Sequence, residues 1–203
     1  IYDGEVVQIK LNPVLSPADN AQAYYKKYNK YKRAQGELRQ QIQTTEEALE
    51  YLATLDASLL TATTKNEIEE IRQEMVAAGL IKEFGKKKKA ALQKSQPLHI
   101  KLRQGVDIYI GKNNKQNDYV TFTIGGPRDL WFHTKDIPGS HLIMKAAAAT
   151  DEDIQLAIAL AAYFSKGRNG SNVPVDCVER RYVKKPSGAK PGFVIFTNQK
   201  TYY

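Results

Sequence analysis

Apolar residues in the first third of the chain recur every three or four positions, not at every second one. From Ala18 to Leu60 there is no proline and a single glycine, Gly36. A strict four-three spacing has eight apolar side chains at its eleven positions, which are Tyr24, Tyr28, Tyr31, Gln35, Leu38, Ile42, Thr45, Leu49, Leu52, Asp56 and Leu59. This seam is typical of a coiled coil. It predicts one continuous helix of roughly 65 Å, at about 1.5 Å per residue, that projects from the rest of the chain.

A second, shorter helix is predicted from Lys65 to Ala78. Thr64 and Glu67 have the spacing of a capping box, and Gly79 ends the helix. Its apolar face consists of Ile68, Ile71 and Met75. This helix can cover only about two turns of the long seam. We therefore infer that the partner of the seam lies outside this chain or in a second copy. The alternative is a lone helix lying over the C-terminal domain.

From Pro97 the pattern changes to the period of two that β-strands show. A hairpin is expected from 98–103 and 106–110 around Gly105, and a helix from Asp151 to Ser165. Further strands are expected at 130–134, 142–145, 173–178, 181–183, 192–197 and 201–203. The stretch Tyr119–Ile124 fits either a strand or a helix. The predicted fold class is α+β, a long coiled-coil-type helix followed by a compact mixed α+β domain.

The remaining segments are irregular. Residues 1–17 are expected to be extended, and the lysine-rich stretch 82–96 is expected to be a linker at a domain boundary. The chain has a single cysteine, Cys177, which indicates a core thiol and a reducing compartment. No apolar run approaches the roughly 20 residues that span a bilayer. Since the first residue is Ile1 and not Met, the chain is read as a fragment, and the absence of a signal segment is uninformative.

The charge of the chain is concentrated in its C-terminal part. The 203 residues contain 30 Lys and Arg against 22 Asp and Glu, a net charge of +8. Residues 82–203 contain 21 basic and 10 acidic residues, so the whole excess lies there. A field of one sign attracts polyanions, and nucleic acid is the first partner to consider. A basic surface that only favours solubility is the competing interpretation.

Catalytic and metal-binding patterns have little support. The histidines are His99, His133 and His141. The spacing of zinc ligands is absent, and so are the glycine-rich phosphate loops. Ser140 and His141 share a tight turn, but no nucleophile elbow surrounds them. The expectation is therefore a protein that is not an enzyme and that holds no cofactor and no metal.

Basic and amide residues interleaved with aromatics favour RNA recognition instead, since amides and lysines suit phosphates and base edges and aromatics suit stacked bases. Of two neighbouring aromatics, Phe132 is expected to be buried. Whether Trp131 is buried or exposed is left open. Pro138 and Gly139 are expected to preorganise a recognition turn. The candidate RNA-binding residues are Lys112, Asn113, Asn114, Lys115, Gln116, Asn117, Arg128, Trp131, His133, Lys135, Ser140, His141, Arg181, Lys184 and Lys185.

Several long strings resemble the C-terminal part of the NFACT family. They are IGKNNKQND (110–118), DLWFHTKDIPGSH (129–141), VPVD (173–176) and VKKPSGAKPG (183–192), and LSPADNAQAYYKKYNKYK (15–32) is similar to the family's second coiled-coil arm. The resemblance implies the end of a middle domain at 1–17, a coiled-coil arm and return helix at 18–81, a linker at 82–96 and an RNA-binding domain at 97–203. It also implies a partner helix in sequence that precedes this chain.

The resemblance implies a cytoplasmic role in ribosome-associated quality control. Family members bind the obstructed large ribosomal subunit, ribosomal RNA and tRNA, and promote alanine tailing of stalled nascent chains. The residues that the family uses to select tRNA lie outside this chain. Other members are described as fibronectin- or fibrinogen-binding proteins of the cell surface, so adhesion is the alternative function.

Overall fold

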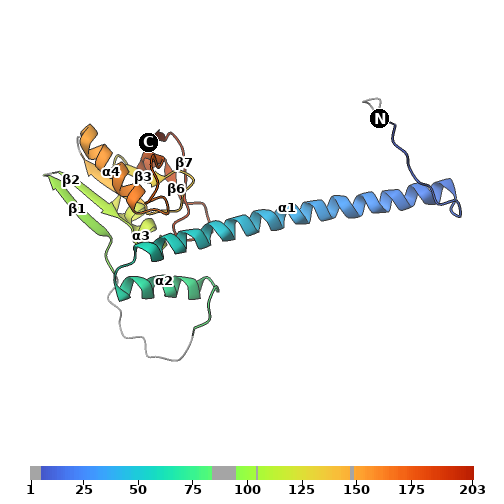
Figure 1. Cartoon of the computed structure of the whole chain (residues 1–203), viewed down its shortest axis with the longest axis horizontal. Helices are drawn as coiled ribbons and strands as arrows, with labels where there is room; N and C mark the ends of the chain where they lie inside the picture. Colours follow the sequence, from blue (N-terminus) through green and yellow to red (C-terminus); the bar gives the residue numbers. More distant parts are fainter. Residues whose placement is uncertain (1–5, 84–94, 104, 147–148) are drawn as a thin grey trace. The chain divides into compact units, whose positions relative to one another are not determined.

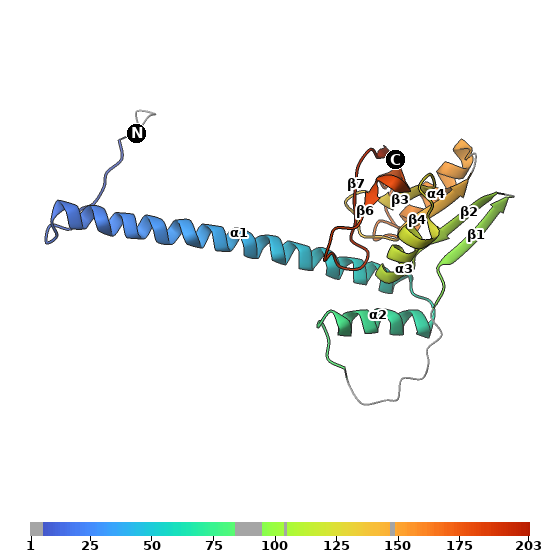
Figure 2. The same ribbon diagram turned by 180° about the vertical axis from the view of Figure 1, so that it is seen from behind.

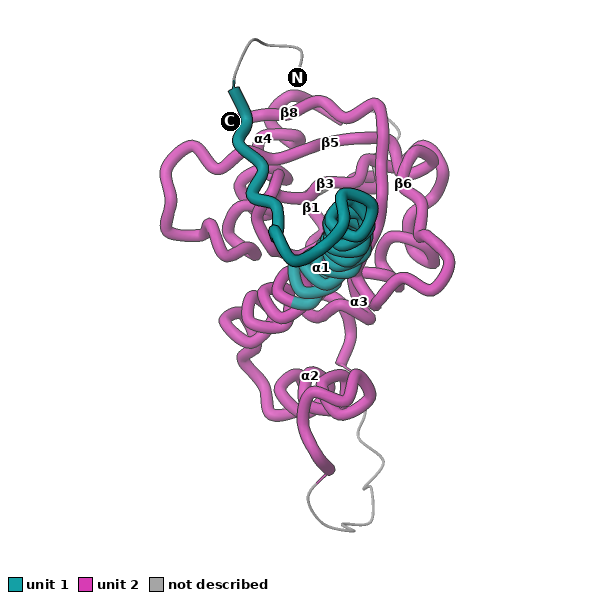
Figure 3. Tube along the Cα trace, turned by 90° about the vertical axis from the view of Figure 1, so that its right-hand side faces the viewer, with its two compact units in different colours: residues 1–48 teal, residues 49–203 magenta. Residues whose placement is uncertain are grey.

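The structure, a computed structural model, describes residues 6–83, 95–103, 105–146 and 149–203. The chain forms two compact units, Ile1–Ala48 and Leu49–Tyr203 (Figure 3). Helix α1 (Pro17–Thr61) is continuous across the boundary between them. The long helix predicted from the four-three spacing is therefore confirmed, and Gly36 does not break it. The lysine-rich stretch lies outside the described residues from 84 to 94.

In the first unit, residues 6–12 form neither strand nor helix, which is compatible with the extended segment expected there. The chain turns into α1 around Asn20, whose buried amide accepts a hydrogen bond from Asn12 N at 2.8 Å and donates one to Asn12 O at 3.0 Å. Ser16 Oγ accepts a hydrogen bond from Asp19 N, as an N-cap does. Local polar contacts thus define where α1 begins.

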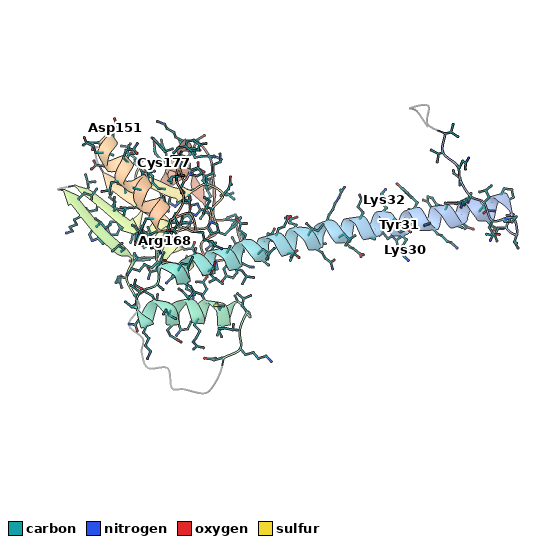
Figure 4. The ribbon with its side chains drawn as sticks, viewed as in Figure 1. Lys30, Tyr31, Lys32, Asp151, Arg168 and Cys177 are labelled. Atoms are coloured by element: carbon teal, nitrogen blue, oxygen red, sulfur yellow. The ribbon has the colours of Figure 1, made fainter. Side chains whose placement is uncertain are left out.

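The seam of α1 is exposed to solvent. Its eight apolar residues have exposed fractions between 41% and 61%, and no described element covers them. Figure 4 labels one of them, Tyr31, between Lys30 and Lys32. An apolar stripe of this length needs a partner helix.

The end of α1 packs on helix α2 (Lys65–Ala77) in the second unit (Figure 1). Tyr51, Leu55 and Ile71 form a small buried cluster. Tyr51 and Leu55 are not seam positions, so α2 contacts a different face of α1. The capping box of Thr64 and Glu67 is present as predicted.

The rest of the second unit is built on a six-stranded antiparallel sheet of order β1-β2-β4-β3-β5-β8. Its strands are β1 (Leu98–Arg103), β2 (Val106–Ile110), β3 (Leu130–Thr134), β4 (Leu142–Ala146), β5 (Val175–Glu179) and β8 (Lys200–Tyr202). The β1–β2 hairpin is the predicted one. Strands β6 (Val183–Lys184) and β7 (Ile195–Phe196) form a separate two-stranded ribbon.

One strand prediction is wrong. Residues Arg180–Tyr182 form a 3-10 turn, η2, and not a strand. Arg180 N donates to Asp129 O at 2.8 Å and Arg181 N donates to Pro127 O at 3.1 Å. These bonds hold the backbone against the turn that precedes β3.

Both faces of the sheet are covered, so the sheet is the middle layer of the domain. Helix α4 (Asp151–Tyr163), capped by Thr150, packs on one face with Phe132 and Leu142. The opposite face carries helix α3 (Asn114–Tyr119), the π-helix η1 (Val120–Ile124) and the β6–β7 ribbon (Figure 2). The stretch that fitted either a helix or a strand is therefore helical.

Phe132 and Trp131 lie on opposite faces of β3, and both are fully buried. The expectation for Phe132 is confirmed. Trp131, a candidate for contact with RNA, is instead covered by Val120 and Phe196. The α+β fold class is confirmed as well, and no helix in the described part of the chain could cross a membrane.

Candidate nucleic-acid interface

The string KNNKQND forms helix α3 and its cap. Asn113 starts the helix, because its side chain accepts a hydrogen bond from Gln116 N at 2.9 Å. The four amide residues, which are Asn113, Asn114, Gln116 and Asn117, are 1% to 7% exposed. Burial of this many polar groups is tolerated only when each finds a partner.

Three side chains of this segment bind the α1–α2 pair. Asn114 Nδ2 lies 2.9 Å from Thr54 Oγ1 on α1 and 2.9 Å from Glu74 Oε1 on α2. Lys112 Nζ lies 2.7 Å from Glu67 Oε1. Asn113 Nδ2 donates to Glu70 Oε2 at 2.9 Å.

The remaining polar side chains of α3 face other segments of the second unit. Gln116 Nε2 donates to Ser95 Oγ at 2.6 Å. Asn117 Oδ1 accepts the amide of His141 at 3.0 Å. Asp118 pairs with Lys185 and accepts a hydrogen bond from Gly192 N at 3.2 Å.

Two glycines allow this close packing. A Cβ on Gly111 would lie 2.2 Å from Asn117 Oδ1, and a Cβ on Gly192 would lie 2.7 Å from Asn114 Oδ1. The prediction that Asn113, Asn114, Gln116 and Asn117 contact RNA therefore needs correction. Their side chains are used inside the protein.

The surroundings of α3 shift the pKa values of two nearby carboxylates in opposite directions. At Glu67 desolvation is outweighed by hydrogen bonds from Lys112 and from the amides of Thr63 and Thr64, which lower its pKa to about 2. At Glu74 desolvation dominates and raises the pKa. Glu74 Oε2 has no hydrogen-bond partner among the described residues, so a proton there removes the cost of burying a charge.

Thr121 organises the core behind β3. Its Oγ1 accepts the indole N–H of Trp131 at 3.2 Å and lies 2.9 Å from His141 Nδ1. The hydroxyl has one proton to donate and two lone pairs to accept with, so the tautomer of His141 sets the direction of its bond to Nδ1. His141 is 2% exposed, and desolvation, with the neighbouring His133 second, holds its pKa well below the ordinary value. Desolvation likewise lowers the pKa of His133 to about 4.

The turn at Pro138 and Gly139 is structural in this conformation. Ser140 is 7% exposed, and its amide donates to Phe164 O at 2.9 Å. A Cβ on Gly139 would lie 2.8 Å from the Cβ of Ser165, so this glycine permits close approach. The positive φ of the turn, 55°, is found at Asp136 instead. Ser140 and His141 thus point inward, and their predicted contact with RNA also needs correction.

The remaining candidate RNA-binding residues differ in their exposure to solvent. Lys112 and His133 are partly buried. Arg181 is paired with Glu179, and Lys185 with Asp118. Within the described residues, four exposed candidates form no ion pair, and they are Lys115, Arg128, Lys135 and Lys184. Exposed basic side chains of this kind can contact phosphates.

Sequence analysis did not identify Thr54, Glu74 or Thr121 as important positions. Their partners lie between 10 and 60 residues away in sequence, and no local pattern marks them. Cys177 is a core thiol as expected, with its pKa raised to about 12 by burial. The described residues contain no cluster of three potential metal ligands.

We expect His141→Ala to destabilise the fold. The change removes the hydrogen-bond partner of the Thr121 hydroxyl and the ring contact with Trp131, and it leaves a cavity, at a cost on the order of 1 to 3 kcal/mol. Urea unfolding measures this cost. Lys101→Ala, at an exposed position of β1, is the control and should cost less than about 0.5 kcal/mol. A His141→Ala protein as stable as the control would show that the buried cluster does not support the fold.

Acid should destabilise the protein through His133 and His141. An unfolded histidine has a pKa of about 6.5. Because both folded values lie lower, the unfolded state binds more protons below pH 6.5, and the free energy of unfolding falls as the pH drops towards 4. Glu67 contributes only below about pH 4.5, so the window from 6.5 to 4.5 isolates the histidines from it. Urea unfolding across this window should give a shallower pH dependence for His141→Gln. Equal slopes in the two proteins would contradict the assignment.

Family models and known relatives match this chain. Residues 1–95 match the family model for the NFACT N-terminal and middle domains, and residues 98–191 match that for the NFACT protein RNA binding domain. The chain is 40% identical to the Rqc2 homolog RqcH of Bacillus subtilis over 210 residues, and 40% identical to that of Streptococcus suis over 201 residues. These alignments cover 100% and 98% of this chain, and the chain spans 36% of the length of each relative.

A solved structure shows the same fold. The C-terminal part of the fibronectin/fibrinogen-binding protein from Streptococcus suis superposes with a TM-score of 0.81 at 40% identity, over 94% of this chain and 76% of that one. The similarity to known proteins, in sequence and in structure, extends over nearly the whole chain. The chain belongs to the NFACT family and carries its RNA-binding domain.

Proposed function

We propose that this chain is the RNA- and ribosome-binding part of a ribosome-associated quality control factor. In this role it engages obstructed large subunits together with their ribosomal RNA and tRNA, in the cytoplasm, and supports alanine tailing of stalled nascent chains. The part described here binds and positions, and does not catalyse. The single observation that carries the proposal is the RNA-binding domain model at 98–191, together with relatives called Rqc2 homologs.

The electrostatics support this proposal. The excess of positive charge lies in residues 82–203, and Lys115, Arg128, Lys135 and Lys184 are exposed there. Exposed lysine and arginine bind phosphates with little regard to sequence, because much of the affinity comes from released counterions. The four buried amides and the buried His141 are excluded from this surface.

The exposed seam supports a second part of the proposal. A coiled-coil partner helix, supplied by sequence outside this chain, covers the seam of α1 in the full-length protein. The tyrosine-rich start and the leucine-rich continuation of the seam give it an apolar stripe at the spacing of paired helices. The arm then serves as a rigid extension of the factor.

Adhesion is the second candidate, and one observation favours it. The solved relative from Streptococcus suis is named a fibronectin/fibrinogen-binding protein. Binding of purified fibronectin and of structured RNA to the same preparation, at the same salt concentrations, separates the two functions.

We expect Arg181→Ala with Lys184→Ala to weaken RNA binding and to flatten its salt dependence. Each lost phosphate contact lowers the slope of log K against log salt by about 0.7 to 0.9. Titration of structured RNA at several salt concentrations measures it. Lys65→Ala with Lys101→Ala removes the same charge at exposed positions of α2 and β1 and serves as the control. A slope equal to that of the control would place the RNA surface elsewhere.

In the full-length protein, the Arg181→Ala, Lys184→Ala variant should copurify less with large subunits that carry peptidyl-tRNA, and alanine tails should become fewer. The reason is that weaker RNA contact shortens residence on the subunit. Pull-down with quantification of ribosomal RNA and tails is the measurement. Normal copurification and tailing, in a variant whose RNA affinity has fallen, would disconnect this surface from ribosome rescue.

A further inference from the structure

The last 24 residues contain no acidic side chain. Glu179 is the final carboxylate of the sequence, and residues 180–203 contain six basic residues, which are Arg180, Arg181, Lys184, Lys185, Lys190 and Lys200. This segment forms η2, the β6–β7 ribbon and β8. A segment with basic side chains and no acidic ones suits a polyanion.

The β6–β7 ribbon has one inner and one outer face. Val183 pairs with Phe196, and both pack on the core around Trp131. Lys184 pairs with Ile195, so these two point to the other side, because successive residues of a strand alternate between faces. Phe193 lies two positions before Ile195, just outside β7, and is exposed as Ile195 is. We call Lys184, Phe193 and Ile195 the outer face of the ribbon.

The outer face exposes apolar side chains next to positive charge. Phe193 is 44% exposed and Ile195 is 52% exposed, whereas Val194 and Phe196, their neighbours in sequence, pack inward. Lys184 is exposed opposite Ile195, and cross-strand neighbours have Cβ atoms about 5 Å apart. An aromatic ring beside a lysine can stack on a base while the lysine binds the phosphate.

Fixed contacts hold this face in place. Phe193 N donates to Lys190 O at 3.2 Å, and Lys190 Nζ lies 4.5 Å from the centre of the Tyr51 ring. Gly192, with a φ of 78°, hydrogen-bonds Asp118. The approach to β7 is therefore ordered before any ligand binds, which lowers the entropic cost of binding.

We propose that the outer face of the ribbon binds unpaired bases of single-stranded RNA. The Phe193 ring stacks on a base, Ile195 packs beside it and Lys184 contacts the adjoining phosphate. The ligand is single-stranded because the faces of bases inside a duplex are already stacked. This inference rests on the proposed function and adds to it a preference for unpaired nucleotides.

The test compares a single-stranded RNA with a duplex of the same sequence, using the full chain. Phe193→Ala should weaken binding of the single strand about tenfold and leave duplex binding unchanged. The salt slope should stay the same, because the slope counts phosphates and not stacked bases. Phe193→Trp should retain wild-type affinity. Leu156→Ala, which truncates a 40% exposed residue of α4, should have no effect.

Other results would overturn the inference. An equal loss for strand and duplex with a flatter slope would mean that Phe193 only positions Lys184. Unchanged single-strand binding in Phe193→Ala and in Ile195→Ala would mean that the face meets a protein or another part of the chain. If the wild-type chain binds no RNA, the proposed function itself fails. If binding depends on Arg181 and Lys184 but not on Phe193, only this inference fails. Melting temperatures identify any variant that loses its fold. If Phe193→Ala does so, Ile195→Ala is tested in its place.

Discussion

Burial of the four amide side chains of α3 is the constraint on which the second unit depends. A buried amide without partners is costly, so each one requires a donor or acceptor at a fixed position. Asn114 obtains its partners from α1 and α2, Gln116 from Ser95, and Asn117 from the amide of His141. One short helix thereby joins the end of the long arm, the return helix and the sheet. Apolar packing of Ile71 and Trp131 supplies stability, and the amides determine which surfaces meet.

The elements that could be predicted from the sequence are those with local signals. Helix α1 follows from its four-three spacing, α2 from its capping box, and the β1–β2 hairpin from alternation around Gly105. Burial of α3 could not be predicted, because amides and lysines look alike whether they face water or a buried carboxylate. The partners of Asn114 lie 60 and 40 residues earlier in the chain. Only the tertiary structure shows that α3 is internal.

The same reasoning explains the aromatic and histidine candidates. A strand with apolar residues on both faces predicts that something covers each side, but the sequence does not name the cover for Trp131. Here η1 and the short β6–β7 ribbon supply it, and both were ambiguous or misplaced in their local pattern. The unpaired candidates that stay exposed are basic and lie in turns, on the ribbon or, for Lys115, on α3. Loops tolerate charge because their side chains keep their hydration.

Because α3 binds α1 and α2, the lysine-rich stretch is a boundary in composition but not in folding. A gene fusion or recombination event that joined new sequence at Leu98 would carry the sheet but leave behind Thr54, Glu67, Glu70 and Glu74. The amides of α3 would then face water or an unrelated surface, and the orientation of the sheet would no longer be tied to a helix. The smallest part of the chain that keeps these contacts therefore begins near Leu49.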